Sequence, residues 1–264
     1  MMRSTISPNQ KKRLPKPITV TFVAVFWILV WQIVYYIVGS DIIVASPIST
    51  FKRVIELGST AYFWACTLNS ILHILCGFLL ALIVSIVLAA LCSKSKLLYT
   101  LFSPIIKLIK ATPVASFIVL ALFWLSSGVS SFIAFLMVMP LIFTNLVEGF
   151  KNVDPSLLEM AKVYRFSRLK KIRLIYIPSI MPYFVSACSV GLGFAWKSGI
   201  AAEVIGLPKT SLGLEIYNAK IYLETVDIFA LTAVIIILSV IMEKGFMFLL
   251  KKLSNRILKG GGKS

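Results

Sequence analysis

Residues able to do catalytic or metal chemistry are few in this sequence, and they are not grouped. The four cysteines, Cys66, Cys76, Cys92 and Cys188, lie in or beside apolar runs without a C-x-x-C spacing, and His73 is the single histidine. Metal sites and disulfide frameworks need such residues at characteristic spacings. We therefore predict no metal, no cofactor and no disulfide framework. An ionisable residue within a membrane span can be functional, but we favour a neutral His73 bonded to a helix neighbour.

The final residues, KGGGKS, resemble the end of a phosphate-binding loop. That loop requires G-x-x-x-x-G-K-[ST] at the start of a helix, whereas the first glycine position here is Ile257 and nothing follows Ser264. The sequence also lacks a G-x-S-x-G elbow and an H-E-x-x-H pair. No nucleophile, base or metal constellation supports a membrane-embedded enzyme, so we predict that the chain is not an enzyme.

The composition indicates a polytopic membrane protein. The chain of 264 residues is 59% hydrophobic and only 14% charged, which fits neither a soluble domain nor a disordered chain. A bilayer core of about 30 Å needs about 20 apolar residues per helix. Six runs qualify, of which the third and fourth contain Pro104, Pro113 and Pro140: residues 18–38, 67–92, 103–125, 130–148, 179–200 and 226–250. The fold class predicted is therefore an all-α membrane protein with about six transmembrane helices.

The net charge is +17, and the positive residues are distributed unevenly between the two sides of the predicted spans. If both termini lie on one side, 22 of the 27 Lys and Arg residues lie there, in residues 1–17, 93–112, 149–177 and from Lys244 onward. Cytoplasmic loops carry such an excess of Lys and Arg. We predict cytoplasmic tails at residues 1–17 and 251–264 around a transmembrane domain, residues 18–250, and no nucleic-acid partner. The first run is too long for a signal peptide and should remain as a span.

The long polar connection Asp154–Pro178 has the pattern of a helical hairpin. Asp154 can cap a helix that has Pro155 at its first position and Glu159 in its first turn, and that ends near Tyr164. Ser167 can cap a second helix, and Pro178 marks the return to the membrane. The residues alone leave open whether this is a solvated connection or a functional element. The whole connection between the predicted spans, residues 149–178, is about 30 residues long, and this length favours function.

The same segment resembles the EAA loop of the permease subunits of bacterial ABC importers. The residues that carry the resemblance are E-M-A at Glu159–Ala161 and I-Y-I-P ending at Pro178. Further blocks resemble the nitrate/sulfonate/taurine-type permeases, from about residue 44 to the last span: ASPIST from Ala45, LIKATPVASFIVLALFWLSSG from Leu108, PLIFTNLVEGFKNVDPSLLEMA from Pro140 and AWKSGIAAEVIGLPKTSLGLEIYNA from Ala195.

The resemblance implies a type I ABC-importer permease fold in a bacterial inner membrane. The expected partners are a cytoplasmic ATP-binding-cassette ATPase that hydrolyses the ATP, an extracytoplasmic solute-binding protein, a second permease subunit in a homodimer, and membrane lipid. The implied solute is nitrate, taurine, another sulfonate or a heterocyclic vitamin precursor. The alternative is a secondary transporter driven by an ion gradient, in which His73, Lys197 and Glu203 would couple ion and solute.

The resemblance also gives the hairpin a role, because in such permeases this helix inserts into a groove of the ATPase. Glu159 would be the interface carboxylate, Ala161 the small residue that permits close approach, and Leu157 and Tyr164 the apolar anchors. Two residues depart from the family pattern: Met160 replaces its middle alanine, and Arg165 its loop glycine, which allows a positive-φ turn that arginine resists. The complete coupling set is Leu157, Glu159, Met160, Ala161, Tyr164, Arg165 and Pro178.

Two further sets of residues lie within the spans. Small residues recur every four positions at Ala187, Gly191, Ala195 and Gly199, and such a stripe lets another helix approach closely, either in the same subunit or in a second one. Polar or aromatic residues in apolar surroundings are candidates for the translocation path, although each can instead bond a neighbouring helix or anchor the span. These candidates are Thr112, Asn145, Trp196, Lys197 and Glu203.

Overall fold

The protein is an elongated bundle of helices. The structure, a computed structural model, describes residues 16–125 and 128–260, and the described elements are all helical. They are α1 (Lys16–Val38), α2 (Pro47–Gly58), α3 (Ala61–Lys94), α4 (Lys96–Ala111), α5 (Val114–Leu122), α6 (Val129–Lys151), α7 (Pro155–Val163), α8 (Arg168–Lys171), the π-helix η1 (Ile172–Tyr176), α9 (Ile177–Gly206), α10 (Leu212–Ile221) and α11 (Thr225–Gly260).

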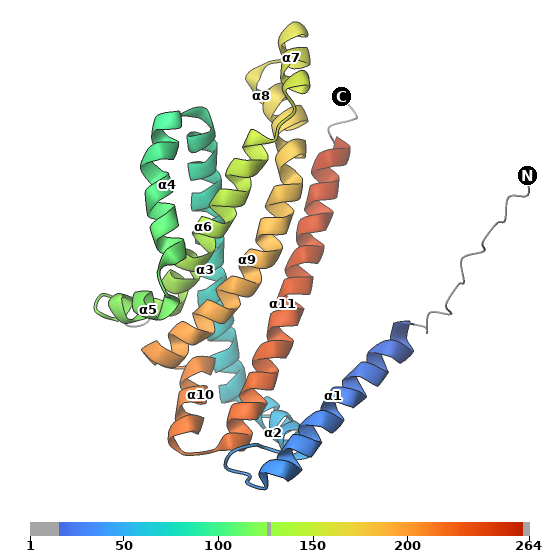
Figure 1. The fold of residues 1–264 in the computed structure, drawn as a ribbon, viewed down its shortest axis with the longest axis vertical. Helices are drawn as coiled ribbons and strands as arrows, with labels where there is room; N and C mark the ends of the chain where they lie inside the picture. Colours follow the sequence, from blue (N-terminus) through green and yellow to red (C-terminus); the bar gives the residue numbers. More distant parts are fainter. Residues whose placement is uncertain (1–15, 126–127, 261–264) are drawn as a thin grey trace, which may run out of the picture.

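Helices α3, α6 and α9 form the centre of the bundle, and α11 packs along α9 (Figure 1). One end carries α7 and α8, and we call it the hairpin end. The opposite end carries α2 and α10. Among the described residues, five helices are long and apolar enough to cross a membrane, and the bent pair α4 and α5 makes a sixth if counted as one. The predicted all-α membrane fold is confirmed.

The third predicted span is not one straight helix. Helices α4 and α5 are bent by 98° around the break at Thr112 and Pro113. Proline disfavours helical geometry in the residue before it, and Thr112 is accordingly extended, with a ψ of 132°. Pro104 and Pro140 instead lie inside α4 and α6, which continue through them.

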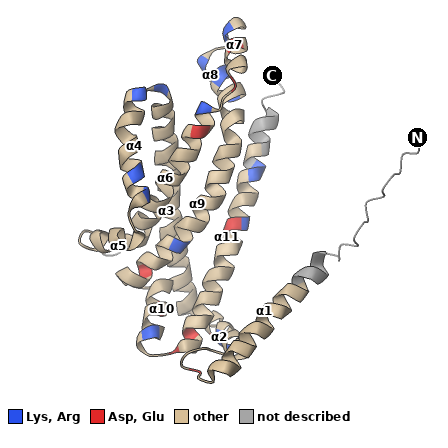
Figure 2. Cartoon of the chain, in the orientation of Figure 1, with Lys and Arg blue, Asp and Glu red and all other residues tan. Residues whose placement is uncertain are grey.

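The course of α4 determines where the basic residues of the segment 93–112 lie. Helix α4 begins beside the last turn of α3 at the hairpin end and runs away from it (Figure 2). Lys94 and Lys96 lie at that end as expected, but Lys107 and Lys110 lie in the second half of α4. Lys107 and Lys110 therefore lie partway along the bundle and not in the short connection between α3 and α4.

Helix α1 extends away from the bundle (Figure 1). None of the residues in its apolar window, Thr21–Val38, is buried. It is attached near its second end, where Trp31 stacks on Phe229 at 5.7 Å between ring centroids and donates a hydrogen bond to the Ala45 carbonyl. Most of this apolar helix is left to contact lipid or another chain.

The end with α2 and α10 is held to α11 by polar contacts. The Arg53 guanidinium of α2 binds both carboxylate oxygens of Asp227, at 2.6 and 2.8 Å, and also reaches Glu56. The hydrogen bonds to Asp227, and to a smaller extent the one to Glu56, raise the pKa of Arg53 above its ordinary value. Thr225 donates a hydrogen bond to the Ile42 carbonyl. The start of α11 is thereby tied to both α2 and the chain before it.

The predicted small-residue stripe on α9 faces helices of the same chain. Ala187, Gly191, Ala195 and Gly199 are all buried. A Cβ at Gly191 would lie 3.2 Å from Val138 Cγ1 of α6, and one at Gly199 would lie 2.5 Å from Ile74 Cγ1 of α3. The described contacts thus favour packing within the subunit over packing between subunits.

A methyl group at Gly199 should therefore destabilise the bundle. Gly199→Ala places its Cβ in the space of Ile74, which is itself fully buried, and overpacking of this kind costs about 1–3 kcal/mol. The matched control is Gly193→Ala in the same helix, where an added Cβ meets nothing within 4 Å. In thermal unfolding of the purified permease, only Gly199→Ala should lower the melting temperature. Equal melting temperatures for the two variants would contradict this packing.

Candidate functional site

The hairpin between α6 and α9 begins with the predicted cap. The Asp154 carboxylate accepts a hydrogen bond from the Ser156 backbone N–H at 2.8 Å, and Pro155 is the first residue of α7. Hydrogen bonds from the hydroxyl and backbone N–H of Ser156 lower the pKa of Asp154. Helix α7 ends at Val163 with Tyr164 as its C-cap, within one residue of the predicted end.

Glu159 is not in the first turn of α7, where it was predicted. It is the fifth residue of the helix and is exposed, so the helix dipole, which acts within the first turn, gives it little stabilisation. Exposed apolar residues accompany it at i, i+3 and i+7, namely Leu157, Met160 and Tyr164, with 37%, 40% and 71% of their surfaces exposed. This stripe lies on the element that protrudes furthest from the bundle at the hairpin end (Figure 1).

Ala161 lies beside this stripe, one turn after Leu157, but its side chain is buried inside the hairpin. It is only 1% exposed and belongs to a small core inside the hairpin with Val153 and Ile175. Leu158, Phe166 and Tyr176 pack against that core. A larger side chain at position 161 would disturb the hairpin itself, so the small residue is required by internal packing.

The turn after α7 is left-handed although its residue is arginine. Arg165 has a φ of 51°, the conformation that usually favours glycine. The Phe166 N–H donates to the Ala161 carbonyl at 2.9 Å and the Arg165 N–H to the Lys162 carbonyl at 3.1 Å. This pair of hydrogen bonds is a Schellman motif. The positive-φ turn expected of glycine is therefore kept by Arg165.

The second half of the hairpin returns to the bundle through an uninterrupted helical path. The Ser167 hydroxyl caps α8 by accepting a hydrogen bond from the Lys170 N–H at 3.3 Å, as predicted. The π-helix η1 then leads into α9, where Pro178 is in the first turn. π-Helical turns are rare and frequent at functional sites. No sequence pattern signalled this one.

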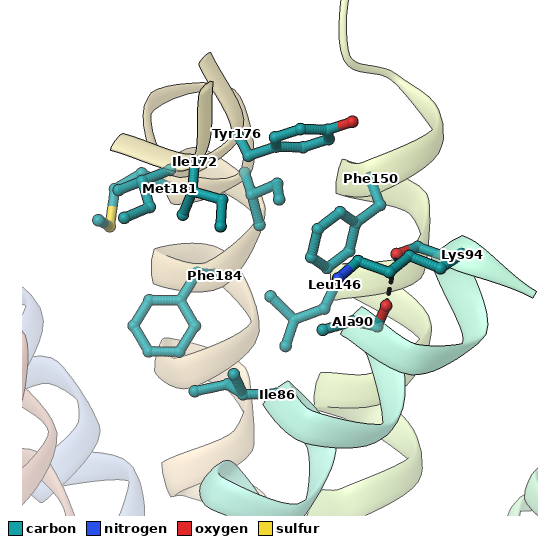
Figure 3. A pocket seen from close by; sticks show the side chains of 12 residues that line it. Ile86, Ala90, Lys94, Leu146, Phe150, Ile172, Tyr176, Met181 and Phe184 are labelled. Atoms are coloured by element: carbon teal, nitrogen blue, oxygen red, sulfur yellow. Dashed lines mark hydrogen bonds between the residues drawn. The ribbon is translucent and has the colours of Figure 1, made fainter. Parts of the chain in front are cut away.

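A mostly apolar cavity of about 490 Å³ lies where the hairpin joins the bundle (Figure 3). Its walls come from α3, α6, η1 and α9, and include Ile86, Leu146, Phe150, Tyr176 and Phe184. The base of the hairpin is therefore incompletely packed against the central helices.

The five candidate path residues are not gathered in one place. Thr112 and Asn145 each bond the carbonyl four residues earlier in their own helix. Trp196 is 2% exposed and donates to the Ile235 carbonyl of α11 at 3.1 Å, which is a packing contact. Lys197 is exposed on α9.

Glu203 is buried and binds two neighbouring segments. Its Oε2 atom accepts hydrogen bonds from the Ser70 hydroxyl of α3 at 2.7 Å and from the Gly213 N–H of α10 at 3.2 Å. Ser70 in turn accepts a bond from the Leu212 N–H at 3.0 Å. A Cβ at Gly213 would lie 2.3 Å from Glu203 Cβ. Ser70 and Gly213, which no sequence pattern indicated, complete a contact that fixes the start of α10 against α3 and α9.

His73 lies near this contact. Its Nδ1 atom bonds the Asn69 carbonyl at 2.9 Å, which confirms the predicted bond to a helix neighbour. His73, Asn69, Ser130 and Lys209 line a pocket of about 460 Å³ together with Glu203. Among the described residues no cluster of His, Cys, Asp and Glu could hold a metal ion.

These features describe a bundle of membrane-length helices with a capped helical hairpin protruding from one end. Residues 81–259 match the family described as the binding-protein-dependent transport system inner membrane component. The chain belongs to this family, the permease subunits of ABC transporters, and the secondary-transporter alternative has no support.

Three similar proteins illustrate the range of this family. A putative ABC transporter permease of Methanocaldococcus jannaschii is 24% identical over 84% of this chain and 85% of its own length. The nitrate import permease NrtB of Synechocystis is 24% identical over 81% of this chain and 83% of its own. The taurine permease TauC of Escherichia coli, at 26% identity, is matched over 58% of this chain and 56% of its own length.

Substitutions at Glu203 should separate its hydrogen bonds from its charge. Both bonds end on one oxygen, which the amide of Glu203→Gln can replace, so the melting temperature of this variant should stay near that of the parent. Glu203→Ala leaves the buried Ser70 hydroxyl and Gly213 N–H without an acceptor, and each costs about 1–3 kcal/mol. The melting temperatures of the two variants, measured by thermal unfolding, check both expectations. If Glu203→Gln were as unstable as Glu203→Ala, the carboxylate charge would be essential to the contact.

The Arg165 turn should respond to the shape of the side chain. Arg165→Gly can keep the positive φ, whereas the β-branched Arg165→Val should destabilise the turn by about 1 kcal/mol. Hydrogen exchange of the Phe166 N–H reports this directly, because that group donates to Ala161. Exchange should be about fivefold faster in Arg165→Val than in Arg165→Gly. Equal rates would mean that the turn is held by its surroundings alone.

Proposed function

We propose that this chain forms the membrane path of an ABC importer for a small solute that carries an anionic group. A separate ATPase would drive the transport, and an extracytoplasmic solute-binding protein would deliver the solute. The match of residues 81–259 to the inner membrane component family carries the proposal. Similar proteins include permeases for taurine, nitrate and bicarbonate, and these solutes share an anionic, oxygen-rich group.

The hairpin end is proposed to be cytoplasmic, together with both termini. Apart from Lys107 and Lys110, the basic groups predicted for that side support this orientation, because Lys and Arg accumulate in cytoplasmic loops. The α7–α8 hairpin alone carries Lys162, Arg165, Arg168, Lys170 and Lys171, which anionic headgroups would attract. The membrane would be the bacterial inner membrane.

The hairpin is proposed to dock on the ATPase through α7. The exposed stripe Leu157, Met160 and Tyr164 provides apolar anchors on one face of a helix, the arrangement used by helices that bind in grooves. Exposed Glu159 on the same helix is available to a basic group of the ATPase. Ala161, Arg165 and Pro178 would act indirectly, by maintaining the shape of the hairpin.

A second permease subunit is proposed to complete the path. The unburied α1 and the exposed stripe Leu97, Leu101, Ile105 and Leu108 on α4 leave apolar surface that a homodimer or lipid would cover. Of the candidate path residues, we propose that Lys197, Thr112 and Asn145 meet solute, because Lys197 is exposed and the other two are half-buried. Buried Trp196 and Glu203 would instead support the path through their contacts with α11 and α10.

The function is tested by reconstituting the permease with its ATPase and binding protein in liposomes. Uptake of taurine, nitrate or bicarbonate should require ATP and the binding protein, and it should persist when a protonophore and ionophores remove ion gradients. Uptake that continued without the ATPase but stopped with the ion gradient would overturn the proposal.

Cysteine labelling should place Arg165 in the cytoplasm. In a background without the four native cysteines, an impermeant thiol reagent added to intact cells should not label Arg165→Cys, whereas the same reagent should label it in inverted vesicles. Tyr222→Cys, exposed at the opposite end, is the matched control and should show the reverse. Labelling of position 165 from outside would overturn both the orientation and the docking role.

Glu159→Lys should weaken binding of the ATPase without unfolding the permease. Glu159 is exposed beyond the first turn of α7, so its replacement should change the stability by no more than about 0.5 kcal/mol. Reversing one charge of a desolvated interface pair costs about 2–5 kcal/mol of binding. Pull-down of the ATPase and thermal unfolding of the permease measure the two effects. Normal binding and uptake would show that Glu159 has no part in coupling.

A further inference from the structure

Helix α4 has two chemically opposite faces within the membrane region. Leu97, Leu101, Ile105 and Leu108 form its exposed apolar face. At 3.6 residues per turn, the opposite face carries Tyr99, Ser103, Lys107 and Lys110. These four residues line a pocket of about 450 Å³ between α4 and α6.

The pocket between α4 and α6 is basic. Besides Lys107 and Lys110, its lining includes Lys151 from α6, whose ammonium group lies 4.5 Å from the centre of the Tyr99 ring. Glu148 is the one acidic residue among its described lining residues. The ion pairs found within the described residues involve Arg53 and none of these lysines. The pocket therefore has an excess of unpaired positive charge.

The depth of these lysines decides between water and lipid as their surroundings. With a rise of about 1.5 Å per residue, Lys107 and Lys110 lie about 16 and 21 Å along α4 from Lys96. Half of a hydrocarbon core is about 15 Å thick, so if Lys96 is level with the headgroups at the hairpin end, those headgroups are too far away to neutralise Lys110. Charged groups at such depth face a water-filled cavity and mark the pathways of ions or substrates.

From this geometry we propose that the α4–α6 pocket is a binding site for small oxyanions in the translocation path, in which Lys107, Lys110 and Lys151 supply the charge and Ser103 a hydroxyl donor. This inference rests on the proposed function and adds the location of the anion-selective part of the path. Rings of Lys and Arg select anions in other membrane pores. Ammonium and hydroxyl groups donate to the oxygens of a sulfonate, nitrate or bicarbonate, and charge assistance strengthens these bonds.

The test measures the charge of the pocket without requiring transport. Ser103→Cys is introduced into the full-length permease without its native cysteines, which is then assembled with its ATPase in phosphatidylcholine nanodiscs. The rates of modification by an anionic and a cationic methanethiosulfonate reagent are compared. The anionic reagent should react faster, and added nitrate or taurine should slow it.

Paired variants assign this preference to named charges. Lys107→Gln with Lys110→Gln should lower the ratio of anionic to cationic rates by about tenfold, because such fields change local ion concentrations by that order. Lys107→Arg with Lys110→Arg should keep the ratio and shows that the pocket still folds. Lys96→Gln is the control, because it removes one positive charge from the same helix outside the pocket. It should leave the ratio of anionic to cationic rates unchanged.

Several results would overturn the proposal. If the thiol of Ser103→Cys reacted with neither reagent, water would not reach the pocket. If the ratio of anionic to cationic rates were unchanged in the double Gln variant, the two lysines would not be the source of the preference. A preference abolished by phosphatidylglycerol in the nanodiscs would assign the pocket to lipid headgroups. A failure of ATP-driven uptake with an intact rate ratio would count against the proposed function only, and the reverse result against the pocket only.

Discussion

Close contact between the backbones of α3, α6 and α9 is the constraint on which the rest of the structure depends. A Cβ at Gly77 of α3 would lie 2.1 Å from the Ser131 carbonyl oxygen of α6, and Gly199 of α9 leaves similarly little room beside Ile74. Inside a bilayer, apolar surface alone gives helices no reason to associate, so close packing at small residues has to hold them together. Because these three helices form one tightly packed unit, the hairpin at one end and the α10 contact at the other are attached to the same rigid centre.

The hairpin and the bundle are packed by different means. The hairpin has its own core around Ala161 and closes its turn with the Schellman hydrogen bonds at Arg165. Its junction with the bundle instead contains the π-helix η1 and the apolar cavity. An element that is rigid in itself but loosely packed at its base can tilt as a unit, because tilting disrupts few well-packed contacts. That combination suits the docking role proposed for the hairpin.

Much of this architecture could be predicted from local patterns, and the reasons for the failures are physical. Span length and the caps at Asp154 and Ser167 depend on nearby residues, so their signals are contained in short stretches of sequence. The 98° bend between α4 and α5 was signalled by Pro113, but nothing local distinguished it from Pro104 and Pro140, which helices accommodate. Glu203 was selected as an ionisable residue in a span. Its partners Ser70 and Gly213 could not be selected in this way, because they come from other helices and no pattern in the sequence links them to Glu203.

Lys107 and Lys110 show how one wrong element boundary can hide a candidate site. With a span expected to begin at residue 103, these lysines were counted as surface charges that set the topology. With α4 beginning at Lys96, the same residues lie deep along a helix whose other face is leucine-rich. A lysine at a membrane surface needs no explanation beyond topology, whereas one at this depth requires water or an anion beside it. The position at which α4 begins therefore determines whether Lys107 and Lys110 are interpreted as a topological signal or as part of the proposed path.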